Sequence, residues 1–434
     1  MRLDRIFRCA WSLCLLVLLL CVTFASAGDV FAAEILSDRE IHFPSHFGHP
    51  EQPLTRYERI VIISQDIPHG KIVSFIADAP LFAWQALDLP DSEIKSDRIL
   101  LVPGSGAVFE GSDIFLPVRE MVDSYTSTPG MDGNSYSYTY TSNGTLLYHY
   151  PDPHGQWELL YRHDGIGEPA FNSVHVFEEC WIAFSYIWEN TEVEWEPLIF
   201  VEFPTFYQED YGGGIGWLDP NIQDVHMQFR YEGQPVPNIS VLGDTINFVR
   251  NLSARFTIID PHRKLHEGSI SAFRMHWDGT TWSQRWITPH RVVWVWTIGP
   301  AEEWYLLNTS SFNDQVNNGA FAPGLLHYVD SAVNSVELPA PCTADSEDHL
   351  QPLTAIDGTP MVGIKNVGFA FLNSTGTWEC VQVDPEAQGV FAALDADSVY
   401  YSSDSYSLAY YHDGDSQLIP FNDVITQIYI LTKP

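Results

Sequence analysis

The sequence has few positive charges. Lys and Arg number 21 against 56 Asp and Glu, which gives a formal net charge of −35, and the lysines are Lys71, Lys95, Lys264, Lys365 and Lys433. Such an excess of negative charge repels nucleic-acid phosphates and anionic membranes at long range. We therefore expect no nucleic-acid partner. The acidity itself suits solubility, a saline or acidic exterior, or a load of divalent cations.

Motifs of the common enzyme families are absent from the sequence. No HExxH, GxSxG or GxxxxGK[ST] occurs, and no Cys or His spacing fits a zinc site. The segment Gly104-Ser105-Gly106 lacks the third glycine and the helix that a dinucleotide site requires. Pairs such as Glu178/Glu179 or Glu209/Asp210 suit glycoside cleavage only at a set carboxyl separation. At this acid content, adjacent pairs are also expected by chance.

Long apolar runs are absent beyond the first residues. Arg2, Arg5 and Arg8 precede the apolar run Trp11–Phe24, and Ala25-Ser26-Ala27 fits a signal-peptidase site. This run is short for a membrane span, which needs about 20 apolar residues. We expect residues 1–27 to be a cleaved signal peptide, with an uncleaved anchor as the alternative. The mature protein would then be periplasmic or extracellular, with 18 Lys and Arg against 55 Asp and Glu and no transmembrane span.

A hairpin pattern recurs about every 40 residues from residue 146 to the C-terminus. Each copy has an aromatic-rich run, a turn with Asp, Glu or Asn, and a second run that often opens with Trp. The copies span 146–161, 184–198, 273–288, 369–383 and 408–421, with weaker ones at 227–242 and 325–339. Four strands with their turns fit this repeat length, and arrays of such units form β-propellers. We therefore predict an all-β fold with little helix, a single β-propeller of seven or eight four-stranded blades. A β-sandwich is the alternative.

The two ends of the chain predict how the ring closes. The runs 59–64, 71–77 and 82–89 read as three strands, and the final run 425–431 has no partner of its own. Pairing of this C-terminal strand with the N-terminal blade would remove a sheet edge. We read residues 28–56 as an extended lead-in, 57–434 as the propeller, and 91–133, the least repeat-like part, as an insertion.

Two kinds of residue recur with the repeat. Cys342 and Cys380 stand one repeat apart, which allows a disulfide between neighbouring blades in an oxidising compartment, while Cys180 would remain single. Four tryptophans recur at one position of the hairpin, and we expect them in the packing between blades: Trp157, Trp195, Trp282 and Trp378.

Cations concentrate between residues 250 and 291. Arg263 and Lys264 stand between His262 and His266 in a connection of one blade, and blade connections form the rims where propeller ligands usually sit. A cationic rim in an acidic protein would select an anion such as a uronate or sialate carboxylate, which Arg binds bidentately. Pairing of these cations with neighbouring carboxylates is the alternative.

A second candidate site lies in the segment 206–219, which reads as a loop. It combines Tyr207, Tyr211 and Trp217 with Glu209 and Asp210 around a run of glycines. Aromatic rings beside carboxylates suit carbohydrate binding or a calcium ion. We expect no other cofactor, and an ordinary blade connection is the alternative reading of the segment.

The segment Met275–Trp282, with the sequence MHWDGTTW, resembles the repeats of secreted propellers of the sialidase-like and lectin-like kinds. The resemblance covers most of residues 135–421 at the level of the superfold. A sialidase Asp-box reads S-x-D-x-G-x-T-W, whereas Asp278 and Gly279 are adjacent here, so that box is not met. The resemblance implies a secreted propeller and no particular activity, because one superfold hosts many functions.

These features favour an exported, non-enzymatic propeller that binds a carbohydrate or a protein. A repeat scaffold provides rigidity, and 14 Trp, 20 Tyr and 25 Phe provide contact area. One alternative is a glycan-cleaving hydrolase or lyase that uses Asp or Glu with Arg. Another is a structural module of a larger surface assembly.

Overall fold

The computed structural model describes residues 57–433 except 67–70, 80, 91–98, 110, 131–132, 153–154, 165–169, 178–180, 199–200, 220–223, 233–238, 244, 261–262, 311–320, 331, 384–385 and 405. The expected signal peptide 1–27, the lead-in 28–56 and Cys180 lie outside the described residues. In the described part, one short 3-10 helix, Glu347–His349, accompanies the strands. No helix in that part is long and apolar enough to cross a membrane.

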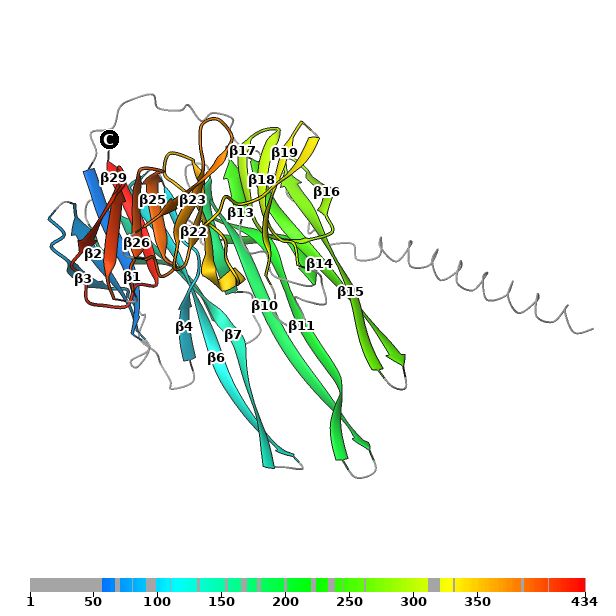
Figure 1. The fold of residues 1–434 in the computed structure, drawn as a ribbon. Coiled ribbons are helices and arrows are strands. Elements are labelled where there is room, and N and C mark those ends of the chain that lie inside the picture. Colours follow the sequence, from blue (N-terminus) through cyan, green and yellow to red (C-terminus); the bar gives the residue numbers. More distant parts are fainter. Residues whose placement is uncertain are drawn as a thin grey trace, which may run out of the picture.

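Seven antiparallel blades form a ring, as the repeat predicts (Figure 1). Blade 1 joins β29 (Gln427–Lys433) to β1 (Tyr57–Asp66), β2 (Lys71–Asp78) and β3 (Gln85–Asp88). Blade 2 has β4 (Ile99–Pro103) and β5 (Ala107–Phe109) along β6 (Asp113–Gly130), then β7 (Gly133–Pro151) and β8 (Glu158–Asp164). Blade 3 contains β9 (Ala170–Phe177), β10 (Trp181–Leu198), β11 (Val201–Asp219) and β12 (Asp224–Glu232).

The remaining four blades follow in chain order. Blade 4 contains β13 (Ile239–Leu242), β14 (Thr245–Asp260), β15 (Arg263–Trp277) and β16 (Trp282–Thr288). Blade 5 contains β17 (Arg291–Gly299), β18 (Glu302–Asn308), β19 (Pro323–Val329) and β20 (Ala332–Val336). Blade 6 contains β21 (Leu350–Thr354), β22 (Pro360–Ile364), β23 (Gly368–Leu372) and β24 (Trp378–Gln382). Blade 7 contains β25 (Phe391–Asp395), β26 (Ser398–Ser402), β27 (Leu408–His412) and β28 (Asp415–Ile419).

The C-terminal strand closes the ring, as predicted. β29 pairs antiparallel with β1 from Tyr57↔Lys433 to Ile63↔Gln427. Alternate residues of these strands pack on opposite neighbours: Ile60 and Ile430 against blade 7, and Val61 and Leu431 against blade 2. Because successive side chains of a strand face opposite ways, a run of consecutive apolar residues is what a sheet buried on both faces requires.

The first strands of successive blades lie side by side around the centre of the ring, with β5 beside β9, β9 beside β13, and β29 beside both β25 and β5. Gly104-Ser105-Gly106 separates β4 from β5 there. Ser105 accepts a hydrogen bond from the amide of Val174, and the amide of Gly106 donates to the hydroxyl of Tyr429 at 3.1 Å. A Cβ on Gly104 or Gly106 would clash with neighbouring blades. These glycines therefore serve a close approach of three blades.

The predicted hairpins are third-to-fourth strand pairs in five of the seven copies. The copy at 184–198 is wrong, because these residues continue along the single strand β10. The copy at 227–242 is also wrong, because it runs from β12 into β13 of the next blade. Trp157 and Trp378 are buried at the start of fourth strands as expected, whereas Trp195 lies within β10. Residues 99–130, inside the expected insertion 91–133, form β4, β5 and β6 of blade 2.

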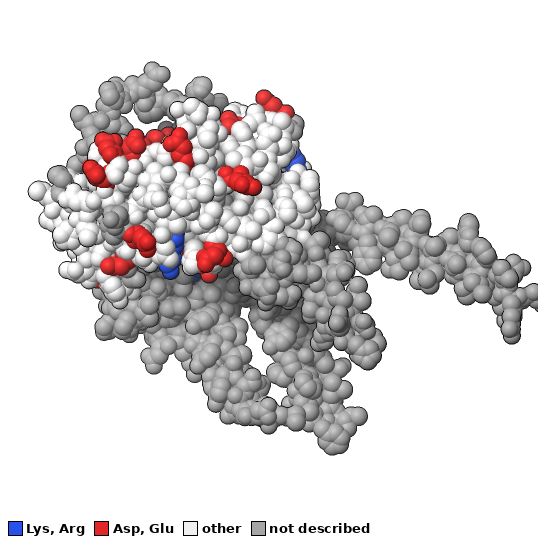
Figure 2. Space-filling model, in the orientation of Figure 1, with Lys and Arg blue, Asp and Glu red and all other residues white. Residues whose placement is uncertain are grey.

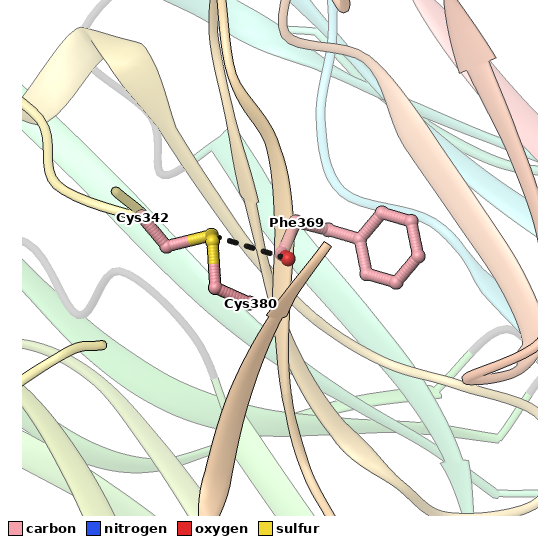
Figure 3. The surroundings of a disulfide bond; sticks show 3 residues. All are labelled: Cys342, Phe369 and Cys380. Carbon is pink, nitrogen blue, oxygen red and sulfur yellow. Dashed lines mark hydrogen bonds between the residues drawn. A yellow bond between two sulfur atoms is a disulfide. The ribbon is translucent and has the colours of Figure 1, made fainter. Parts of the chain in front are cut away.

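A disulfide joins Cys342 and Cys380, as predicted, with their Cα atoms 5.7 Å apart. Cys342 lies in the connection from β20 to β21, and Cys380 lies in β24, so the bond ties the entry of blade 6 to its outer strand rather than joining two blades. The Cys342 Sγ lies 3.3 Å from the carbonyl oxygen of Phe369 in β23. Figure 3 shows this contact beside the disulfide. Both cysteines lie in an apolar cluster with Trp296, Trp304 and Trp378.

Candidate functional site

Three hairpins extend beyond the ring from one end of the molecule (Figure 1). They are β6–β7, β10–β11 and β14–β15, the second and third strands of consecutive blades. The neighbouring strands stop short: β4 pairs with β6 only as far as Val122, and β9 pairs with β10 only as far as Ile187. Beyond these points each hairpin continues as a two-stranded ribbon about 20 to 35 Å long, since a strand rises roughly 3.3 Å per residue.

The first ribbon, residues 123–140, is here called the tyrosine ribbon. It holds no Lys, Arg or Glu and is composed largely of Ser, Thr, Tyr and Gly. Its register pairs Tyr125 with Tyr138 and Asp123 with Tyr140. Tyr136, Tyr138 and Tyr140 stand at every second position of β7, and Tyr125 is the only tyrosine of the ribbon in β6.

The second ribbon, residues 189–211, is here called the acidic ribbon. It contains no Lys or Arg, and its acidic residues are Glu189, Glu192, Glu194, Glu196, Glu202, Glu209 and Asp210. The segment 206–219, expected to be a loop, is instead part of β11. The register of β11 on β10 pairs the sequence-predicted Tyr207 with Val193, Glu209 with Thr191 and Tyr211 with Glu189.

Trp217 stands apart from the other residues of that candidate site. It lies in the part of β11 that belongs to the blade and is 1% exposed, among Ile215, Ile246 and Phe248. An indole with no exposed face cannot stack on a ligand at the surface, so we leave Trp217 out of the site.

The third ribbon, residues 254–269, is here called the basic ribbon. It contains Arg255, Arg263 and Lys264 with Asp260 and Glu267. The predicted connection is the tip of this ribbon, where Asp260 pairs with Arg263 and Thr257 with His266. Lys264 pairs with Ile259 in the same register. His262 lies outside the described residues.

Other cations of the segment 250–291 pair with carboxylates within and between blades. Glu303, 3% exposed, pairs with Arg274 and with Arg285, the latter at 2.8 Å, and accepts a hydrogen bond from the hydroxyl of Tyr305. Burial raises the pKa of Tyr305 well above its ordinary value, and the Glu303 carboxylate adds to this rise. Arg291 pairs with Glu347 at 3.0 Å. These three arginines therefore follow the alternative reading, in which cations of the segment neutralise neighbouring acids.

The opposite end of the ring carries the short turns and is acidic. Asp330 and Asp413 are exposed in the β19–β20 and β27–β28 turns, and Asp415 is exposed at the start of β28. Figure 2 shows acidic side chains along this end and few Lys or Arg on the described surface of that face. In the β15–β16 turn, hydrogen bonds from Thr281 and Thr280 to the Asp278 carboxylate lower its pKa.

Within the described residues, no group of three His, Cys, Asp or Glu side chains is placed to hold a metal ion.

A hollow of about 320 Å³ opens beside the β22–β23 turn, the kind of connection that is extended into ribbons in blades 2 to 4. It is lined by Thr343, Ala344, Asp345, His349, Lys365 and Asn366. The His349 Nδ1 lies 2.6 Å from the Asp345 carboxylate, so these two side chains of the lining contact each other.

Comparison with known proteins extends the fold assignment no further. No family model and no curated protein matches the sequence. Among solved structures, TolB from Acinetobacter baumannii is 10% identical over 86% of this chain and 67% of its own, with a TM-score of 0.36. An oligogalacturonate lyase from Vibrio parahaemolyticus is 10% identical over 74% and 96%, with a TM-score of 0.34. An apocarotenoid oxygenase from Synechocystis is 10% identical over 86% and 74%, also at 0.34. Likeness at this level says nothing about function.

Proposed function

We propose that the protein is an exported, non-enzymatic binding module that holds a protein or a carbohydrate at the end of the ring that bears the ribbons. The observation that carries the proposal is the presence of three ribbons in consecutive blades, all directed from one end. The ring closes through β1 and β29 and packs its cores between blades, so its architecture does not depend on these extensions.

The ribbons suit contact with a ligand better than they suit folding. A two-stranded hairpin is marginally stable by itself, and its outer edges expose unpaired main-chain groups. The tyrosine ribbon has the Tyr, Ser and Gly composition that binding loops use for rigid, amphipathic contact area. The three ribbons differ in charge, so each can contact a chemically different part of one ligand.

The glycan-cleaving alternative needs two carboxyl groups beside a sugar bond. The described Glu303 is closed in between blades 4 and 5 by Arg274, Arg285 and Tyr305, which fits an ion cluster of the scaffold. Hydrolysis or lyase activity on a glycan panel would restore that alternative.

Export is part of the proposal. It rests on the apolar run Trp11–Phe24 behind three arginines and on the Cys342–Cys380 disulfide, because such bonds persist in oxidising compartments. The N-terminal residue of the secreted protein tests it: we expect a start at or near Gly28, whereas retention of residues 1–27 would contradict cleavage.

The binding test compares the intact protein with a variant in which 123–140, 189–211 and 254–269 are each replaced by Asn-Gly, a dipeptide that favours two-residue hairpins. Both are applied to an array of defined glycans and an array of defined soluble proteins. We expect the intact protein to bind without releasing reducing ends, and the variant to lose that binding while keeping its circular dichroism. Binding that survives removal of the ribbons, or an intact protein that binds nothing on either array, contradicts the proposal.

A further inference from the structure

The hollow in blade 6 lies at the end of the ring that bears the ribbons, because the β22–β23 turn joins the second and third strands of its blade as the ribbons do in blades 2 to 4. Its volume of about 320 Å³ is at the lower end of the range for small-ligand sites. Two segments line it: Thr343, Ala344, Asp345 and His349 come from the connection before β21, and Lys365 and Asn366 come from the β22–β23 turn. The hollow therefore has the size for a small ligand or for one unit of a larger one.

The two segments that line the hollow are fixed by bonds within the protein. The Lys365 amide donates a hydrogen bond of 2.9 Å to the carbonyl oxygen of His349, which joins the turn to the connection. Cys342, the residue before Thr343, is held to Cys380 of β24 by the disulfide. Walls that are ordered before binding lose little conformational entropy when a ligand enters, and this favours affinity.

Lys365 provides the positive charge of the hollow. Within the described residues, no carboxylate lies at ion-pair distance from its ammonium group. Five arginines of the described part are instead each paired with an acid: Arg59, Arg162, Arg274, Arg285 and Arg291. In a chain with 56 Asp and Glu, Lys365 is thus an exception to the pairing of cations with acids. Its three N–H donors are available to an anion that enters the hollow.

The other polar groups of the lining favour an anion with a single charge and several hydroxyl groups. The His349 Nδ1 lies 2.6 Å from the Asp345 carboxylate, and this hydrogen bond lowers the pKa of Asp345. An ionised Asp345 accepts hydrogen bonds from hydroxyl groups, and it repels a doubly charged phosphate ester more than a carboxylate. The Thr343 hydroxyl and the Asn366 amide, which also line the hollow, can each donate and accept. The lining therefore offers one cation for a carboxylate and three polar side chains for hydroxyl groups.

We propose that this hollow binds a hexuronate, a sugar with one carboxylate, with Lys365 on the carboxylate and Thr343, Asp345 and Asn366 on the ring hydroxyls. The inference rests on the proposed function, since it names the ligand class at the end of the ring that bears the ribbons. It places the anion in blade 6 rather than at Lys264 in the basic ribbon, where the sequence predicted it. The hollow holds one uronate unit of a larger carbohydrate, and the ribbons contact the remainder.

The test titrates the intact protein with three small probes and follows binding by nuclear magnetic resonance at one ionic strength. The probes are methyl glucuronide, methyl glucoside and the 6-phosphate of methyl glucoside, which differ only at the sixth carbon of the sugar. We expect methyl glucuronide to bind, and the neutral and the phosphorylated probes to bind at least about fivefold more weakly. This factor is the size expected for one hydrogen-bonded charge pair at a half-exposed site.

Two variants with the same change in net charge locate the site. Lys365→Gln removes the cation of the hollow, and Lys264→Gln removes a cation of the basic ribbon. We expect at least about fivefold weaker binding of methyl glucuronide by the first variant and less than about twofold change in the second. A third variant, Thr343→Trp, fills the hollow from an exposed position and should also weaken binding. Lys365 has no ion pair to lose, so the thermal transition of Lys365→Gln should match that of the intact protein.

Several outcomes would overturn the inference. Equal binding of glucuronide and glucoside, or equal losses in the two lysine variants, would show that no specific charge contact is made in the hollow. A loss with Lys264→Gln alone would return the anion to the basic ribbon, and tighter binding of the phosphorylated probe would exclude a carboxylate site.

The inference and the proposed function fail in different ways. Absence of glucuronide binding, while removal of the three ribbons still abolishes binding on the arrays, rejects the hexuronate site alone. Glucuronide binding that depends on Lys365, in a protein whose array binding survives removal of the ribbons, keeps the site in the hollow and contradicts the part given to the ribbons.

Discussion

At the scale of single residues, we expect substitutions to lower stability most where the first strands of the blades meet around the centre of the ring. Gly106 lies where β5, β9 and β29 meet, and a Cβ there would run into the buried hydroxyl of Tyr429. We expect Gly106→Ala to lower the free energy of unfolding by roughly 1–3 kcal/mol, the range for overpacking a core. Gly299→Ala is the matched control, because only Glu302 approaches that position, at 3.9 Å. Equal effects of the two substitutions on the free energy of unfolding in urea would contradict the prediction that the close contact at Gly106 matters for stability.

His175 in β9 predicts how stability depends on pH. Desolvation by burial lowers its pKa to about 4, so the folded protein resists protonating this ring. The unfolded chain takes up the proton below about pH 6.5, and stability is therefore lost as the pH falls from about 6.5 towards 4. We expect His175→Gln to reduce the loss between pH 7 and 5 by on the order of 1–2 kcal/mol. The measurement is urea unfolding of both proteins at the two pH values; parallel losses would contradict the prediction.

At the scale of elements, the disulfide fixes the entry of blade 6 to its outer strand. The two cysteines are 38 residues apart, so reduction would free a long loop in the unfolded chain. We expect loss of the bond, by reductant or by Cys342→Ser with Cys380→Ser, to lower the free energy of unfolding by about 3–4 kcal/mol. Chemical denaturation with and without reductant measures this, and an unchanged midpoint would show that the bond adds no stability.

The sequence predicts blade elements well where strands are short and turns are marked. The β23–β24 hairpin is an example, because the Asn373 side chain accepts hydrogen bonds from the amides of Thr375 and Thr377, and Trp378 opens the next strand. The same signals gave a wrong prediction for the acidic ribbon. The hairpin predicted at 184–198 requires a turn near Glu189, whereas cross-strand pairing with β11 keeps this residue extended. The alternating Ser and Tyr of 135–140 were the signal that long strands extend past a blade.

The candidate sites also show that composition alone does not predict which residues face solvent. Tyr207, Tyr211 and Lys264 were singled out by composition, and the register places them in ribbons directed from one end of the ring. Trp217 was singled out by the same reasoning but lies in the core, because the glycine run around it is strand rather than loop. Which of several aromatic residues faces solvent depends on register, and register is set by neighbouring strands that local sequence does not identify.

At the scale of the whole molecule, ring closure should govern cooperativity. β29 provides the first strand of blade 1 and contacts the first strands of blades 2 and 7. We expect removal of residues 426–434 to open the ring, because it exposes Ile60, Ile62 and both neighbouring blades to water. The truncated chain should lose its sharp thermal transition in near-ultraviolet circular dichroism. A transition that persists unchanged would mean that the blades hold together without the closing strand.

The central claim is that the end bearing the ribbons is where the ligand binds. Hydrogen exchange of the intact protein, measured with and without the array ligand that it binds best, tests this claim most directly. We predict slower exchange in 123–140, 189–211 and 254–269, with little change in the β19–β20 and β27–β28 turns at the other end. Protection confined to those turns, with the ribbons unchanged, would contradict the account.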